Sequence, residues 1–422
     1  MKAIPHIKLG LMVSLAIGAM PALAKDWPQF RGPDRNGKST ETGIIKSWEN
    51  KAPELLWTGE GMGGGYGGVA VVGDRIYTTG NLKEGQGVVA VNAKDGKVVW
   101  STPLTEGEPK HGFEGTRCTP TVVGDKLWVT TSDGAIACLT TDGKLVWKKN
   151  FKDEWNGKMM SGWGYAESVL VDGQAAICTP GGPDAMMVAL DKDTGKEIWK
   201  CKVPEYGKNG KDGAGYGSAV ISTGAGVKQY VQMTGRGVIG VRASDGKFLW
   251  GYDHVANPTA NISSPVVIGD HVFSSTAYGA GAGLVKLVKD GDGVKAEEVY
   301  FLKADQLQNH HGGMVLVDGY IYCGHKQNGG DPVCIDIKTG KAAWGPEKSI
   351  GKGSAAVTSV DGHVIFRYED GLVVLIEANP KKFTVKGSFK PGFQDGKSWS
   401  YPVVSGGRLY LREQDKLMCY QL

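Results

Sequence analysis

A repeated segment that ends in an aromatic residue constrains the fold of this 422-residue chain more than any other feature. Its first copy is AVNAKDGKVVW, in which an Asp-Gly pair separates two apolar runs. This order of residues is typical of two β-strands joined by a tight turn. The clear copies end at Trp100, Trp147, Trp199, Trp250 and Trp344, and two weaker copies end at Tyr300 and Phe389. These aromatic residues lie about 44 to 52 residues apart, the length of one four-stranded propeller blade.

The spacing predicts seven whole blades and an eighth that is shared between the two ends of the chain. The whole blades are expected at residues 61–100, 101–147, 148–199, 200–250, 251–300, 301–344 and 345–389. Leu55, Leu56 and Trp57 match the last strand of the repeat without a preceding partner, and residues 401–422 read as three strands without a fourth. We therefore expect an all-β, eight-bladed propeller of four-stranded antiparallel blades, closed by the N-terminal strand, because closure removes exposed sheet edges.

The residues before the first blade divide into two segments. Lys2 and Lys8, an apolar run at residues 9–20 and small residues up to Ala24 are typical of a cleavable signal peptide, so a periplasmic or secreted location is expected. Residues 25–51 are polar and aperiodic and predict an arm over the propeller of residues 52–422, held by Trp27 and Phe30 in an apolar groove. No later apolar stretch reaches 18 residues, so no transmembrane segment is expected in the mature protein.

Charge and cysteine content exclude several classes of function. The net charge is +4 without a run of five like charges, which argues against nucleic acid as a partner. The seven cysteines include no Cys-x-x-Cys and no adjacent pair, so structural zinc and thioredoxin-type sites are not expected. Cys323 and Cys334 flank a hairpin almost symmetrically, and two readings stay open for them: a disulfide across the strands, or buried free thiols.

The copy ALDKDTGKEIW resembles the pyrroloquinoline quinone (PQQ) repeat, Ala-x-Asp-x-x-Thr-Gly-Lys-x-x-Trp, of eight-bladed quinoprotein propellers. BamB-like outer-membrane assembly factors are non-enzymatic members with the same fold. The segments WPQFRGPDRNG, NHHGGMVLVDGYIYC and GGRLYLREQDKLMCY are similar to exported PQQ-like propellers without an assigned activity. The resemblance covers essentially the whole chain after the signal peptide. It indicates the fold more strongly than the cofactor, because the repeated Gly and Trp residues serve turns and packing.

The resemblance leaves two classes of function open. The first is a binding or scaffold protein that holds a small molecule, a polymer or a protein partner at its loop face, as BamB-like factors imply. The second is a periplasmic quinoprotein dehydrogenase of alcohols or sugars that uses PQQ with calcium. The chain has no Cys-Cys pair and no match to the calcium-and-base motif of the alcohol dehydrogenases. Smaller sugar dehydrogenases use the quinone without that disulfide, so the sequence leaves enzymatic activity undecided.

The candidate site residues lie in the loops that join one blade to the next, because these loops converge on one mouth of the central channel. The candidates are Arg117, Trp163, Tyr216, Asn261, His310, His311, Lys352 and Trp399. Cationic, imidazole and aromatic groups around one mouth suit a planar or anionic ligand. The alternative is that they line the channel and are hydrated by water.

Some candidates have a more specific expected role. Under the quinoprotein hypothesis, Arg117 or Lys352 pairs with quinone carboxylates, Trp163 stacks on the ring system and a histidine acts as base. Adjacent residues of a strand point to opposite faces, so His310 and His311 are not expected to share a metal ion, and no metal site is predicted. The repeated tryptophans are interpreted as packing residues, because one occurs in each blade.

Overall fold

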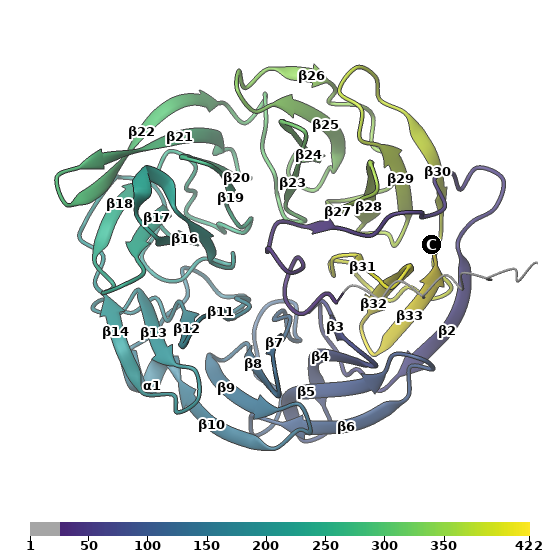
Figure 1. The fold of residues 1–422 in the computed structure, drawn as a ribbon, viewed down its shortest axis with the longest axis horizontal. Helices are drawn as coiled ribbons and strands as arrows, with labels where there is room; N and C mark the ends of the chain where they lie inside the picture. The colour runs from purple at the N-terminus through teal and green to yellow at the C-terminus, as the bar shows by residue number, and fades with distance from the viewer. Residues whose placement is uncertain (1–25) are drawn as a thin grey trace, which may run out of the picture.

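The computed structural model describes residues 26–422 and shows a closed ring of eight four-stranded antiparallel blades (Figure 1). Blades 1 to 4 comprise, from the inner to the outer strand, β3 (Ala70–Val72), β4 (Arg75–Leu82), β5 (Gly85–Asn92) and β6 (Val98–Pro103); β7 (Thr121–Val123), β8 (Lys126–Thr130), β9 (Ala135–Thr140) and β10 (Leu145–Asn150); β11 (Leu170–Asp172), β12 (Ala175–Cys178), β13 (Met187–Asp191) and β14 (Glu197–Cys201); and β15 (Val220–Ser222), β16 (Gln229–Thr234), β17 (Gly237–Arg242) and β18 (Phe248–Tyr252).

Blades 5 to 8 comprise, in the same order, β19 (Val266–Ile268), β20 (His271–Thr276), β21 (Gly281–Asp290) and β22 (Gly293–Leu302); β23 (Met314–Val317), β24 (Tyr320–His325), β25 (Asp331–Asp336) and β26 (Ala342–Trp344); β27 (Ala355–Val360), β28 (His363–Tyr368), β29 (Val373–Glu377) and β30 (Val385–Phe389); and β31 (Val403–Ser405), β32 (Arg408–Glu413), β33 (Lys416–Gln421) and β2 (Glu54–Glu60). The remaining elements are β1 (Lys38–Ser39), helix α1 (Phe151–Trp155) and the 3-10 turn η1 (Gly224–Gly226).

The eighth blade joins the two ends of the chain. Strand β2 pairs antiparallel with β33, with Glu54 opposite Gln421 and Glu60 opposite Lys416. This confirms the predicted eight-bladed fold and its closure by the strand that contains Trp57. Every blade in the described residues therefore has four antiparallel strands, and blade 7 gains β1 as a fifth strand.

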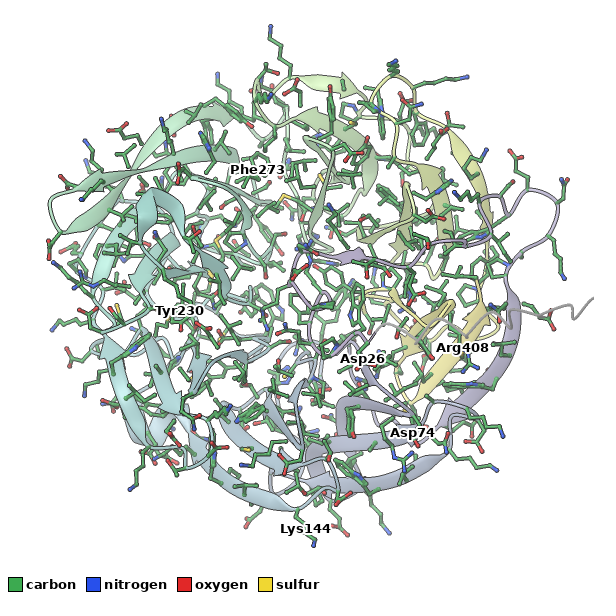
Figure 2. All side chains as sticks on the ribbon, viewed as in Figure 1. Asp26, Asp74, Lys144, Tyr230, Phe273 and Arg408 are labelled. Atoms are coloured by element: carbon green, nitrogen blue, oxygen red, sulfur yellow. The ribbon has the colours of Figure 1, made fainter. Side chains whose placement is uncertain are left out.

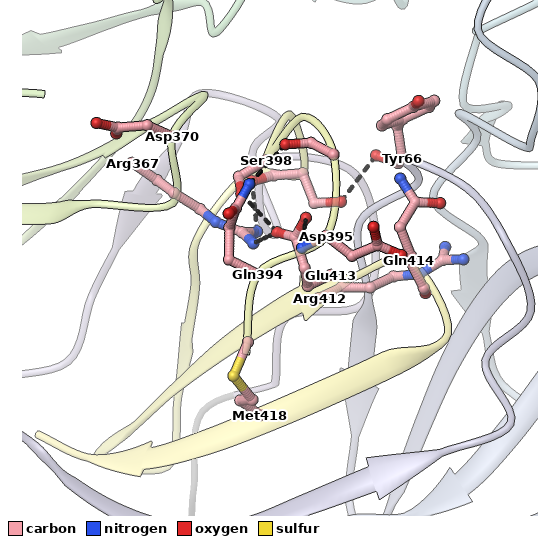
Figure 3. A network of polar contacts seen from close by, with 12 residues as sticks. Tyr66, Arg367, Asp370, Gln394, Asp395, Ser398, Arg412, Glu413, Gln414 and Met418 are labelled. Atoms are coloured by element: carbon pink, nitrogen blue, oxygen red, sulfur yellow. Dashed lines mark hydrogen bonds and ion pairs between the residues drawn. The ribbon is translucent and has the colours of Figure 1, made fainter. Parts of the chain in front are cut away.

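A buried ionic network reinforces this closure (Figure 3). Arg367 of β28 in blade 7 forms an ion pair of 2.5 Å with Glu413 of β32 in blade 8. Arg412, next to Glu413, donates hydrogen bonds to the carbonyls of Gly63 at 2.8 Å and Gly67 at 3.1 Å, in the segment that enters blade 1. The two arginines and the glutamate are at most 2% exposed, so these charged groups at the junction of the chain ends are shielded from water.

The repeated aromatic residues connect each blade to the next. The glycine between the third and fourth strands has a positive φ, as at Gly195 (φ 70°). Because it has no Cβ, the aromatic side chain that ends the preceding blade can pack directly on its backbone. A Cβ on Gly195 would lie 2.8 Å from the Trp147 ring, and the Trp147 indole N–H donates to the Lys192 carbonyl at 2.9 Å. The same ring-on-glycine contact recurs for Trp57 on Gly96, Trp100 on Gly143, Trp199 on Gly246 and Tyr300 on Gly340.

The hydrophobic core lies between and within the blades. Tyr230 is buried between blades 3 and 4 and Phe273 between blades 5 and 6, whereas charged side chains such as Lys144 project from the rim (Figure 2). Trp250 departs from the repeat: its indole N–H donates to Gln229 in its own blade at 2.6 Å. The following blade contains the long β21–β22 hairpin in place of the short Thr-Gly or Asp-Gly turn.

The N-terminal arm, residues 26–48, crosses the centre of the ring (Figure 1). Trp27 pairs with Val71 of β3, and the Pro28 carbonyl accepts a hydrogen bond of 2.8 Å from the Val122 N–H of β7. At its other end, β1 pairs in parallel with β27, where Lys38 lies opposite Ser359. The arm therefore contacts the inner strands of blades 1, 2 and 7.

Two buried arginines fix the middle of the arm. Arg35 is 4% exposed and donates to the carbonyls of Ser168 at 2.7 Å and Ala219 at 2.9 Å, at the entries to blades 3 and 4. Arg31 is 2% exposed and donates to the Met314 carbonyl in blade 6. The predicted anchor Trp27 is buried in an apolar cluster, as expected.

Of the two readings left open for Cys323 and Cys334, the structure supports buried free thiols and not a disulfide. Cys323 lies opposite Val333, and Cys334 lies opposite Tyr322, in the β24–β25 pair. This register places the two side chains on opposite faces of the sheet, because side chains alternate along a strand. All seven cysteines, which lie within the described residues, are buried free thiols.

The predicted signal peptide at residues 1–24 lies outside the described residues. Within residues 26–422, no helix combines the length and the apolar character that a membrane span requires.

Candidate functional site

A cavity of about 390 Å³ lies in the central channel, and we call it the loop-face pocket. Eight Phe, Tyr and Trp rings line it: Phe30, Tyr66, Phe113, Trp163, Tyr216, Tyr278, Trp399 and Tyr401. The titratable side chains that line it are Arg117, His310, His311, Glu369 and Lys397. Phe30 belongs to the arm and packs edge-on against Tyr401 at 5.3 Å, so the arm forms part of the pocket wall.

Small residues two positions before an inner strand leave this volume open. They include Gly68, Thr119, Ser218, Ser264 and Gly312, which precede the inner strands of blades 1, 2, 4, 5 and 6. Larger side chains on the loops above them supply the polar and aromatic groups. The repeat thus accounts both for the volume of the cavity and for the polar and aromatic side chains around it.

Six of the eight candidate residues line the pocket, and Asn261 does not. The Asn261 side chain is fully buried and donates to the carbonyls of Thr234 at 3.0 Å and Gly235 at 2.9 Å. Its amide oxygen accepts from the Asn257 N–H at 2.9 Å. Its side-chain polar groups therefore hold two loops together, and its side chain does not line the pocket.

Lys352 also lies outside the pocket. Its loop is packed against blade 7, since a Cβ on Gly351 would lie 2.3 Å from Tyr368 and one on Gly353 would lie 2.6 Å from Glu369. The Lys352 side chain is exposed beyond this contact. Lys397, from the loop that enters blade 8, supplies the cation at this position.

Arg117 carries a positive charge on the pocket wall without a carboxylate partner in residues 26–422. Its two terminal nitrogens donate to the carbonyls of Gly112 at 3.0 Å, Phe113 at 2.6 Å and Gly115 at 3.1 Å. The guanidinium lies over the Tyr66 ring, 5.6 Å from its centroid. Burial lowers the pKa of Arg117 to about 10, so the side chain stays charged at neutral pH.

His310 is a neutral, fully hydrogen-bonded side chain. Nδ1 is 2.9 Å from the Ser354 hydroxyl, and Nε2 is 2.9 Å from the Tyr278 hydroxyl. Burial, with a further contribution from His311, lowers the pKa of His310 to about 3. Tyr278 has a positive φ of 57°, a conformation that costs a bulky residue free energy and that directs its hydroxyl to the histidine.

His311 and Lys397 share the buried carboxylate of Glu369. His311 Nε2 is 3.2 Å from Glu369 Oε1, and Lys397 Nζ is 2.8 Å from Oε2. Burial alone would raise the pKa of Glu369, but the hydrogen bonds from His311 and Lys397 hold it well below its usual range. Glu369 is therefore an ionised group on the pocket wall that is already paired.

The two adjacent histidines lie side by side, with ring centroids 4.4 Å apart. The prediction that they point to opposite faces is wrong, because they lie in the loop before β23 and not in a strand. His311 also contacts the Trp399 ring edge-on at 4.9 Å.

Sequence reasoning missed several residues because it considered only the loops between blades. Tyr278 and Glu369 lie in the hairpins between the second and third strands of blades 5 and 7. These hairpins lie at the same face of the ring as the loops between blades. A polar residue directly after the second strand of a blade could therefore have been predicted to face the pocket. In blade 7 that signal is the segment Glu-Asp-Gly, which directly follows β28.

Comparison with known proteins gives the family. The sequence model of a family described as "Outer membrane protein assembly factor BamB" matches residues 41–149 and 88–346, well over half of the chain. The chain belongs to this BamB-like family of PQQ-repeat propellers. The repeat resemblance is thereby confirmed.

Curated relatives of this BamB-like propeller include dehydrogenases and an assembly factor. A quinoprotein ethanol dehydrogenase of Pseudomonas aeruginosa is 31% identical over 157 residues, which are 34% of this chain and 24% of the relative. The assembly factor BamB of Burkholderia pseudomallei is 30% identical over 141 residues, 32% of each chain. The match thus spans about a quarter to a third of the curated relatives.

Solved structures support the fold of this BamB-like propeller. A europium-containing methanol dehydrogenase superposes with a TM-score of 0.63 at 13% identity, over 94% of this chain and 98% of the other. The quinohemoprotein alcohol dehydrogenase of Comamonas testosteroni gives a TM-score of 0.63 at 13% identity, over 95% and 81%. At this identity the likeness concerns the fold alone.

Proposed function

We propose that this protein is an exported, non-catalytic binding propeller that holds a small anionic ligand with a flat apolar part in the loop-face pocket. The observation that carries the proposal is the charge of Arg117, which faces an aromatic cavity and has no carboxylate partner among the described residues. The predicted signal peptide supports the exported location. The family supports a binding role, since it includes an assembly factor.

The charges of the pocket favour a ligand with one negative group. Lys397 is paired with Glu369, whereas Arg117 has only backbone carbonyls, a histidine nitrogen and an aromatic face around it. Both of its terminal nitrogens already donate hydrogen bonds to carbonyls of the loop. The Nε–H group is therefore the donor that is left for a ligand. A hydrogen bond to a charged group contributes about 1.5 to 3 kcal/mol. The surrounding rings can pack on an aromatic or otherwise flat ligand.

The quinoprotein alternative fits the pocket less well. Of the two cations expected to bind the quinone carboxylates, Lys352 lies outside the cavity. Calcium prefers six to eight oxygen ligands, and the wall offers the single carboxylate of Glu369, which Lys397 and His311 already occupy. The residues present therefore do not fit a calcium-bound quinone of the alcohol dehydrogenase type.

The test is a tryptophan-fluorescence titration with 4-hydroxycinnamate and with its uncharged amide, because Trp163 and Trp399 line the pocket. We expect the acid to bind more tightly than the amide. Arg117→Gln should weaken binding of the acid by about tenfold, the lower part of the range for a charged hydrogen bond, and leave the amide unchanged. Lys352→Gln is the matched control and should change neither.

Two outcomes would contradict the proposal. One is equal affinity for the acid and the amide in the wild-type protein, or no binding of either. The other is saturable binding of PQQ with calcium together with dye reduction on an alcohol or sugar, which would support the dehydrogenase alternative.

A further inference from the structure

The pocket wall holds a cluster of donor atoms that ligand recognition by Arg117 does not use. His310, His311 and Glu369 each offer one ligand atom, and the three atoms lie within 4.8 Å of one another. The cluster combines two imidazole nitrogens with one carboxylate oxygen. It lies on the cavity surface, so a further coordination position faces the pocket.

The spacing of two donors already fits a tetrahedral metal site. His311 Nε2 and Glu369 Oε1 are 3.2 Å apart. In a tetrahedral zinc site with bonds of about 2.0 to 2.2 Å, neighbouring ligand atoms are about 3.3 to 3.5 Å apart. The metal would take the place of the direct contact between His311 Nε2 and Glu369 Oε1. Lys397 holds the other oxygen, Oε2, at 2.8 Å and so orients Oε1 toward the histidine.

His310 is oriented by a group behind it. The Ser354 hydroxyl bonds Nδ1 at 2.9 Å and fixes the ring, an outer contact of the kind that supports metal-binding histidines. On the other side, the Tyr278 hydroxyl bonds Nε2 at 2.9 Å. A metal bound to Nε2 would displace this hydroxyl, and Tyr278 itself lines the pocket.

We propose that His310, His311 and Glu369 bind one divalent transition-metal ion of the zinc type. Two nitrogen donors and one oxygen favour zinc, cobalt or nickel over calcium or magnesium, which prefer oxygen. The open position takes water or an anionic group of a ligand in the pocket. The proposal is independent of the organic ligand, since it concerns the metal alone.

The experiment titrates Zn²⁺ into the chelator-treated, untagged protein and follows the heat of binding, and it repeats the titration with Co²⁺ to record visible absorption. We expect one ion per chain and the intense absorption of four-coordinate cobalt. His311→Gln and Glu369→Gln should each weaken Zn²⁺ binding at least a hundredfold. His254→Gln is the matched control, because His254 pairs with Glu298 at 2.7 Å on another part of the surface.

Thermal unfolding of each variant without metal shows whether it is folded, and His310→Gln replaces any variant that is not. The proposal is overturned by the absence of a one-to-one complex, by six-coordinate cobalt spectra, or by Zn²⁺ binding that survives in the folded pocket variants. Loss of binding in His254→Gln would place the ion elsewhere and would also overturn it. None of these results depends on 4-hydroxycinnamate, so failure here and failure of the proposed function are distinguishable.

Discussion

At the scale of single residues, Glu167 shows how the ring interior changes acid chemistry. It is 3% exposed and accepts hydrogen bonds from the Thr179 N–H at 2.6 Å, the Thr179 hydroxyl at 2.8 Å and the Gln232 amide at 3.0 Å. Burial raises the pKa of Glu167 to about 7, although these hydrogen bonds and the charge of Arg35 oppose the change.

This carboxyl makes stability depend on pH. Its folded-state pKa of about 7 lies above the ordinary value of 4.5, so the folded protein holds the proton more tightly than the unfolded chain. The contribution is fully present below pH 4.5 and is lost as the pH rises through 7. We expect the free energy of unfolding of the wild type, relative to Glu167→Gln, to fall by about 3 kcal/mol over this window. Urea denaturation at several pH values measures it, and parallel profiles of the two proteins would contradict it.

Contacts between side chains of different loops could not be predicted from the sequence. Trp163, Tyr216 and Trp399 were found because every loop between blades leads to one face. Glu369 and Lys397 are 28 residues apart and form an ion pair across two loops, a contact that no spacing rule indicates. Asn261 was mistaken for a ligand-facing group because a short polar side chain in a loop serves backbone carbonyls as readily as a ligand.

At the scale of the element, the turn between the third and fourth strands has two functions in blades 1, 2, 3, 4 and 6. Its glycine takes a positive φ that closes the hairpin, and its bare Cα receives an aromatic ring from the preceding blade. The repeat was readable in the sequence because both functions require the same glycine at the same position. The contact itself, between one blade and the next, could not be read from either hairpin alone.

Two glycines of blade 3 separate these functions. Gly195 (φ 70°) faces the Trp147 ring, whereas Gly173 (φ 59°) has no atom within 4 Å of an added Cβ. Gly173→Ala should cost about 1 to 2 kcal/mol of stability from backbone strain alone. Gly195→Ala adds a clash with the ring, so we expect at least about 1 kcal/mol more, as for overpacking. Chemical denaturation compares the two, and equal losses would show that the ring contact contributes nothing.

At the scale of the whole molecule, the arm ties together blades that do not touch each other. Arg35 reaches blades 3 and 4, Arg31 reaches blade 6, and β1 extends the sheet of blade 7. The sequence predicted an arm and its Trp27 anchor. It could not predict the path of the arm through the channel. The arginines bind backbone carbonyl groups, which occur in every blade and so do not distinguish one blade from another.

Arg35→Met is expected to destabilise the protein by about 3 kcal/mol, because it leaves buried carbonyls at Ser168 and Ala219 without their charged donor. Arg236→Met is the control. Arg236 pairs with Asp212 near the surface, where an ion pair contributes about 0 to 1 kcal/mol. Thermal and urea unfolding measure both variants. Similar losses for the two would contradict a bracing role for the arm.

The pairing of β2 with β33 also sets the order in which the chain can fold. Glu54 meets Gln421, so the first propeller strand has no sheet partner until the last strand exists. The arm likewise needs β27, which follows six complete blades. Contacts between such distant residues carry a large loop-closure entropy, which slows folding. Ring closure is therefore the final step of folding, and the rate of that step governs how long the nascent protein exposes open blade edges.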